Sequence, residues 1–153
     1  MMTRPPGEIH VRTAIPDDAE AIARLSGELG YPTTAADARR RLFDIKTSQN
    51  HAVMVAEDDS GTVVGWIHVF RSRRLGGEPF AELGGLVVTE GLRGHGIGSQ
   101  LVAETEKWAS AHEIATLRIR TRTTRNDARL FYEELGFVLT KTQVVFERQL
   151  LND

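Results

Sequence analysis

A glycine-rich turn between an apolar segment and an amphipathic one constrains the fold of this chain more than any other feature. The turn, residues 93–98, reads Arg-Gly-His-Gly-Ile-Gly, and the apolar run 82–88 before it predicts a buried strand. Apolar side chains recur at helical spacing over 97–112. A helix N-terminus exposes unpaired N–H groups, and glycine lets a ligand approach them closely. The turn therefore predicts a cradle for a phosphate-bearing cofactor.

Two common phosphate-binding patterns do not fit this turn. A Walker A loop ends in Gly-Lys-Ser/Thr, whereas Gly98 is followed by Ser99 and Gln100. A dinucleotide fingerprint requires glycine or alanine where Ser99 stands, and it follows the first strand of a βαβ unit rather than a strand past mid-chain. The spacing excludes both patterns.

The turn instead resembles the acyl-CoA loop of the GNAT superfamily of N-acyltransferases, whose pattern is Gln/Arg-x-x-Gly-x-Gly/Ala. Arg93, Gly96 and Gly98 occupy its three defined positions. Residues 128–137 are similar to the second family pattern, A-x-x-x-Y-x-x-x-G-F, with Tyr132 at the tyrosine position. The order of these elements extends the resemblance over nearly the whole chain.

The resemblance implies acetyl-CoA as co-substrate and no metal. In the family, the pyrophosphate lies across the N–H groups of the loop, and the pantetheine arm pairs with the backbone of the preceding strand. The Arg93 guanidinium would add a charge-assisted contact, while the His95 side chain is expected to face solvent. The cofactor-binding residues implied in this way are Leu86, Val87, Val88, Arg93, Gly94, His95, Gly96, Ile97, Gly98 and Ser99.

Two residues are candidates for the chemistry. Glu82 stands on the strand before the loop, where many family members carry a general base, and the alternative is a solvated or ion-paired carboxylate. Tyr132 is the candidate general acid for the departing CoA thiolate, and the alternative is a core aromatic with its hydroxyl at the rim. Asn126 is expected to cap the helix that carries Tyr132.

The family resemblance implies a mixed α/β fold, a GNAT-like twisted sheet of about seven strands flanked by four helices. Residues 1–7 are predicted to be disordered and 8–153 to form a single N-acetyltransferase domain. Asp17 and Thr34 are the predicted starts of the first two helices, and 73–78 is predicted to be a polar loop. Strands are predicted over 9–13, 52–57, 62–70, 82–88, 116–121, 137–139 and 143–150, and the later helices over 97–112 and 126–135.

Composition limits the remaining function classes. Nineteen Lys and Arg stand against 21 Asp and Glu, a net charge of −2, so no general attraction to nucleic acid is expected. The chain has no cysteine, which excludes disulfides, thiolate metal sites and an acyl-cysteine intermediate. No apolar run approaches the length of a membrane span, so a cytoplasmic protein without membrane contact is expected.

These observations predict an N-acetyltransferase that transfers acetyl from acetyl-CoA to a primary amine of a small molecule or peptide in a direct ternary complex. The alternatives are a non-catalytic acyl-CoA-binding regulatory module and a toxin acting on aminoacyl-tRNA. Trp66, His68 and Phe70 share one strand face, where they either line an amine pocket or pack under the first helices. Val144, Val145 and Phe146 are compatible with a homodimer through C-terminal strands.

Overall fold

The computed structural model describes residues 7–151, so the predicted disordered segment 1–7 lies outside this range except for Gly7. Contacts between backbone positions divide the chain into a first unit that ends at Ile119 and a second that begins at Arg120. Each unit is described by itself. Within the described residues, no helix is long and apolar enough to cross a membrane.

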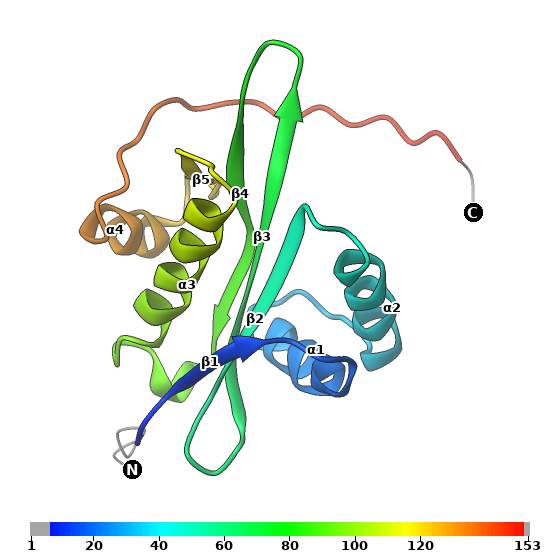
Figure 1. The fold of residues 1–153 in the computed structure, drawn as a ribbon, viewed down its shortest axis with the longest axis vertical. Helices are drawn as coiled ribbons and strands as arrows, with labels where there is room; N and C mark the ends of the chain where they lie inside the picture. The colour runs from blue at the N-terminus through cyan, green and yellow to red at the C-terminus, as the bar shows by residue number, and fades with distance from the viewer. Residues whose placement is uncertain (1–6, 152–153) are drawn as a thin grey trace. The chain divides into compact units, whose positions relative to one another are not determined.

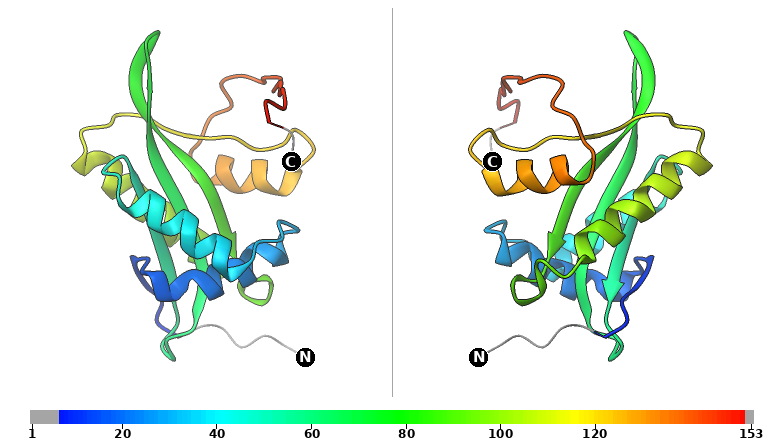
Figure 2. Two further views of the ribbon diagram at one scale, coloured as in Figure 1. Left: turned by 90° about the vertical axis from the view of Figure 1, so that its right-hand side faces the viewer. Right: turned by 90° about the vertical axis from the view of Figure 1, so that its left-hand side faces the viewer.

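The first unit is built on a mixed five-stranded sheet in the order β1-β2-β3-β4-β5 (Figure 1). Strands β1 to β4 pair antiparallel in succession, and β5 pairs parallel with β4. The β3–β4 hairpin extends well beyond the other strands (Figure 2). The strands are β1 (His10–Thr13), β2 (His51–Glu57), β3 (Val63–Arg74), β4 (Gly77–Val88) and β5 (Leu117–Ile119).

Helices cover both faces of this sheet (Figure 1). Helices α1 (Ala19–Glu28) and α2 (Ala35–Lys46) lie on one face, and α3 (Ile97–Ala111) lies on the other. Under α1 and α2, the side chains of Leu25 and Leu42 pack with valines of β2 and β4 and with Trp66. Val87 of β4 belongs to this core, directly before β4 leads into the glycine-rich turn.

The starts of the first two helices differ in how well the sequence predicted them. Thr34 caps α2 as predicted, its hydroxyl accepting a hydrogen bond from the N–H of Asp37 at 3.0 Å. The prediction for Asp17 was wrong, because Asp18 precedes α1 and Asp17 lies in a 3-10 turn, Pro16–Asp18.

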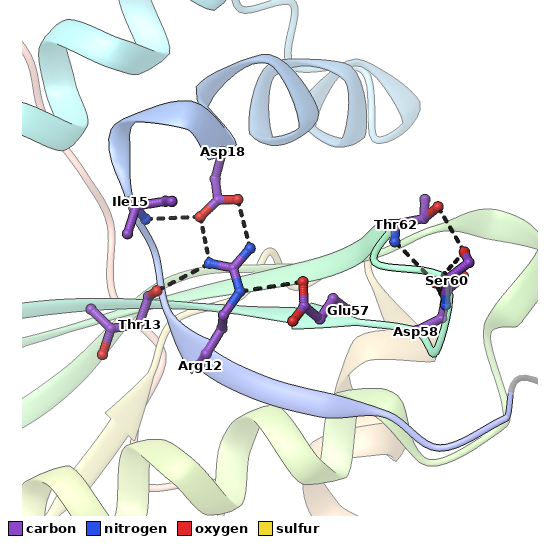
Figure 3. Close-up of polar contacts among 8 residues, drawn as sticks. All are labelled: Arg12, Thr13, Ile15, Asp18, Glu57, Asp58, Ser60 and Thr62. Carbon is purple, nitrogen blue, oxygen red and sulfur yellow. Dashed lines mark hydrogen bonds and ion pairs between the residues drawn. The ribbon is translucent and has the colours of Figure 1, made fainter.

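Burial alone would raise the pKa of Asp18, but hydrogen bonds from Arg12 and the Ile15 N–H outweigh it and lower the pKa (Figure 3).

The β2–β3 connection is the predicted tight turn (Figure 3). The Asp58 carboxylate accepts hydrogen bonds from the N–H groups of Ser60 and Thr62, each at 3.0 Å, and Gly61 takes a φ of +85°. The predicted polar loop over 73–78 was wrong, since β3 runs to Arg74 and β4 resumes at Gly77. Arg74 pairs with Gly77, so the ladder between β3 and β4 continues through these polar residues.

The second unit contains α4 (Asn126–Glu134) followed by a segment without regular secondary structure. The prediction of Asn126 as a helix cap was wrong, because Arg125 holds that position and Asn126 is the first helical residue. The two predicted C-terminal strands were also wrong, since residues 137–151 form no strand and the described sheet has five strands rather than about seven. Apolar residues there favour a strand, but a ladder also needs a partner, and Val144 and Phe146 are 78% and 91% exposed.

Candidate active site

The glycine-rich turn joins β4 to α3 through two left-handed residues. β4 ends at Val88, a short 3-10 turn spans Glu90–Leu92, and α3 begins at Ile97. Gly94 and Gly96 each have a φ of +84°, and a Cβ atom at either position would meet no other atom within 4 Å. The glycines therefore permit a backbone course that L-residues rarely adopt, and they leave its outer side open.

The N-terminus of α3 has no side-chain cap. Gly96 is the residue at the cap position, and it has no side chain that could accept from the first-turn N–H groups. The Ile97 side chain is buried at 1% exposure, so this residue can offer a ligand only its backbone N–H. With 15 residues in α3, the helix dipole adds positive potential at this end, and the arrangement suits a phosphate group.

Two side chains anchor the turn. The Glu28 carboxylate, at the end of α1, accepts from the Glu90 N–H at 2.9 Å and from the Thr89 hydroxyl at 3.1–3.2 Å. The Arg93 Nε donates to the Val88 carbonyl at 3.1 Å. Sequence reasoning missed this role of Glu28, since no spacing rule connects residues 61 or 62 positions apart.

The β4 backbone changes its neighbours along its length. Ala81 to Leu83 pair with β5, whereas Leu86 and Val88 pair only with β3 among the strands of the described residues. A bulge at Gly84, between the pairs Val69–Leu83 and His68–Gly85, accompanies this change. Over the stretch that leads into the turn, the edge of β4 that faces away from β3 thus has no strand partner among the described residues.

Glu82 lies on the face of the sheet that carries α1 and α2. It stands directly opposite Phe70, and paired residues of antiparallel strands project to the same side. Phe70, His68 and Trp66 alternate along β3 and share that side. Trp66 packs under the helices, which is one of the two alternatives that the sequence left open for these residues, while His68 and Phe70 stack with His51 of β2.

The ring of His68 is half-buried and contacts His51, whose Nδ1 lies 2.9 Å from His68 Nε2. Burial, with a smaller effect from the charge of His51, lowers the pKa of His68 from 6.5 to about 4. His68 is therefore uncharged at neutral pH. Sequence reasoning placed His68 on this face but did not anticipate its hydrogen bond to His51.

This pKa predicts an acid-dependent loss of stability. The unfolded chain binds a proton at His68 below about pH 6.5, whereas the folded chain stays neutral there until about pH 4, so acid favours unfolding. The free energy of unfolding should fall by about 1–2 kcal/mol more in the wild type than in His68→Phe between pH 7 and 4.5. Urea titrations at both pH values measure this difference, and equal losses in the two proteins would contradict it.

Tyr132 belongs to the second unit and is described within it. Its ring makes edge-to-face contacts with Phe131 and Phe137, at centroid distances of 5.1 and 5.6 Å. Gly136, with a φ of +93°, ends α4 and lets the Phe137 N–H reach the Tyr132 carbonyl at 3.0 Å. Burial raises the pKa of Tyr132 against a smaller opposing effect of the Arg125 charge, so the phenol carries its proton at neutral pH.

The described residues contain no cluster of three or more His, Cys, Asp or Glu that could hold a metal ion. Within the described residues, the first unit offers a helix N-terminus, a stretch of β4 without a strand partner on one edge, a carboxylate and a pair of imidazoles. The second unit, taken by itself, offers the phenol of Tyr132. Groups of these kinds can bind a phosphate-bearing cofactor and move protons.

Comparisons with known proteins agree with this chemistry. The sequence model of the acetyltransferase (GNAT) family matches residues 18–137. Aminoglycoside N(6')-acetyltransferase type 1 from Serratia marcescens is 27% identical over 139 residues, which cover 88% of this chain and 94% of that protein.

Solved structures share the fold. Aminoglycoside N-acetyltransferase AAC(6')-Iy in complex with CoA superposes with a TM-score of 0.82 at 20% identity, covering 97% of this chain and 99% of that one. A transcriptional regulator from Bacillus halodurans C-125 gives a TM-score of 0.83 at 24% identity, covering 92% and 100% of the two chains.

Proposed function

The chain belongs to the acetyltransferase (GNAT) family, and from this premise we propose that it transfers an acetyl group from acetyl-CoA to a primary amine of a small molecule or peptide. The observation that carries the proposal is the uncapped N-terminus of α3 behind Gly94 and Gly96, next to the unpaired edge of β4. We propose residues 8–153 as one N-acetyltransferase domain.

The same geometry supports a placement for acetyl-CoA. The pyrophosphate would accept hydrogen bonds from backbone N–H groups between Arg93 and Ser99, and the pantetheine amides would pair with the backbone from Leu86 to Val88. The Val87 side chain is 4% exposed, so it contributes to the core while its backbone serves the cofactor. Acetyl-CoA supplies the thioester and the leaving thiolate.

Two side chains would handle the protons. Glu82 would take a proton from the substrate ammonium, because an amine with a pKa near ~10.4 is mostly protonated at neutral pH and cannot attack. The amine nitrogen then bonds to the carbonyl carbon, the C–S bond breaks, and its electron pair leaves on sulfur. Tyr132 would give that sulfur a proton. The nitrogen would lose its second proton to solvent as the amide forms, the phenolate would regain a proton from solvent, and no acyl-enzyme is needed.

The role of Tyr132 has a direct test. Tyr132→Phe removes the proton donor but keeps the ring contacts with Phe131 and Phe137, so kcat should fall about 10²-fold or more while the Kd for acetyl-CoA changes little. Steady-state kinetics together with calorimetry separate the two constants. Tyr31→Phe, which alters an exposed tyrosine, is the control. An unchanged kcat would remove Tyr132 as general acid.

The acceptor class is tested by release of CoA thiol in the presence of different amines. The similarity to aminoglycoside acetyltransferases makes aminoglycosides the first set, followed by polyamines and lysine-containing peptides. Amine-dependent thiol release with an acetylated product detected by mass spectrometry supports the proposal. Acetyl-CoA binding without transfer to any amine would favour the regulatory-module alternative, and transfer to aminoacyl-tRNA alone would favour the toxin.

We also propose a cytoplasmic location and a homodimer. The absence of cysteine suits a reducing compartment. Val144, Val145 and Phe146 are each at least 78% exposed in the second unit, which supports their burial against a second copy. Light scattering of the purified protein measures the mass of the assembly.

A further inference from the structure

Three aromatic rings form a stack across two strands on the Glu82 face of the sheet. The centroids of His51 and His68 are 5.2 Å apart, and Phe70 lies 5.4 and 5.5 Å from them. His51 stands opposite Phe70 in the register, and Phe70 stands opposite Glu82 on the next strand. The stack thus runs from β2 to the position beside the candidate base.

The hydrogen bond between the imidazoles fixes how the pair can act. His51 Nδ1 and His68 Nε2 lie 2.9 Å apart, so one ring donates and the other accepts. Only His51 Nε2 and His68 Nδ1 are left to bind anything else. In an uncharged pair, one of these two atoms carries a proton and the other a lone pair, so the pair offers one donor and one acceptor at opposite ends.

The bulge in β4 places Gly84, two residues after Glu82, against the His68 end of the pair. A Cβ atom at Gly84 would lie only 2.5 Å from His68 Nδ1, and one at Gly85 would lie 2.7 Å from the Trp66 ring. Glycine at both positions therefore makes room for the rings to lie over β4. Gly84 is exposed and stands two residues after Glu82, so His68 Nδ1 lies against an exposed stretch of the β4 backbone.

We propose that His68 Nδ1 is a second hydrogen-bond acceptor for the substrate amine beside Glu82, and that the Nδ1 of His51 holds His68 in the required tautomer by accepting from Nε2–H. This inference rests on the acetyltransferase function proposed above. An attacking amine has two N–H groups and one lone pair. Acceptors at Glu82 and His68 would hold both N–H groups, which leaves the lone pair directed at the thioester carbon.

Asparagine and leucine at position 51 test this role. Asparagine carries a polar atom close to the place of Nδ1 and can accept from His68, whereas leucine keeps the bulk without the acceptor. His51→Leu should raise the KM for the amine about 10-fold and leave the KM for acetyl-CoA unchanged, and His51→Asn should restore most of the loss. Thermal unfolding confirms that both variants are folded.

Position 68 gives the complementary test. Asparagine there retains a polar atom near Nδ1, and glutamine retains one near Nε2, so His68→Asn should keep more amine affinity than His68→Gln. If the wild type is active and the two variants at position 51, or the two at position 68, have equal kinetics, the inference is overturned and the proposed function is not. A wild type that acetylates no amine would instead overturn the proposed function.

Nitrogen-15 NMR of the wild type reads the tautomer without any substrate. The inference expects the proton of His68 on Nε2 at pH 7, with Nδ1 unprotonated. A proton on Nδ1 would make that atom a donor and would contradict its role as an acceptor. This measurement therefore decides the tautomer whether or not an acceptor amine has been found.

Discussion

Replacing Gly96 with tryptophan should abolish detectable binding of acetyl-CoA. Gly96 has a φ of +84°, where any L-residue costs about 1–2 kcal/mol, and no atom lies within 4 Å of a Cβ built there. The indole would therefore extend into the open side of the turn, where the pyrophosphate would lie. Calorimetric titration of the variant with acetyl-CoA measures the effect, and an unchanged Kd would remove the turn from the cofactor site.

A control substitution at a second glycine separates the effect of backbone strain from the effect of filling the cofactor cradle. Gly61, in the β2–β3 turn, has a φ of +85° and also meets nothing within 4 Å of a Cβ. Gly61→Trp introduces the same strain outside the β4–α3 turn and should leave the Kd for acetyl-CoA near that of the wild type. Equal loss of binding in both variants would mean that destabilisation of the fold, and not occupation of the cradle, is responsible.

Glu82→Gln should lower kcat/KM for the amine by about 10²–10⁴-fold, the usual contribution of a general base. Glutamine keeps the size of the side chain and its place opposite Phe70 but cannot accept the proton. The acidic limb of the pH–rate profile should flatten at the same time, because that limb reports protonation of the base. Initial rates between pH 5 and 9 measure both effects.

Glu78 provides the matched control for this substitution. It lies on the same strand, four residues before Glu82, and its side chain is exposed. Glu78→Gln removes the same charge from β4 and should leave kcat/KM and the profile unaltered. If the two variants behave alike, or if Glu82→Gln retains its acidic limb, base catalysis belongs to another group.

The sequence predicted the part of the fold in which local pattern and tertiary structure agree. The apolar strand, the glycines and the amphipathic helix around residues 93–98 each satisfy local rules, and the structure confirms β4, the turn and α3 in that order. Thr34 was predictable for the same reason, since a helix cap depends on residues three positions apart.

Features that depend on distant partners could not be predicted in this way. The anchoring of Thr89 and Glu90 by Glu28, and the contact between His51 and His68, join residues that only the sheet and helix packing bring together. In the C-terminal segment, a local preference predicted a structure that does not form. Val144 and Phe146 favour a strand by composition, but no strand forms among the described residues of that segment.

Binding of acetyl-CoA to the wild-type chain tests the central claim most directly. Isothermal titration calorimetry should show one acetyl-CoA bound per chain, with no comparable heat from NADH or ATP, because the spacing of the turn fits neither a dinucleotide fingerprint nor a Walker A loop. Absence of acetyl-CoA binding, or equal binding of the three cofactors, would contradict the assignment of the β4–α3 turn as an acyl-CoA site.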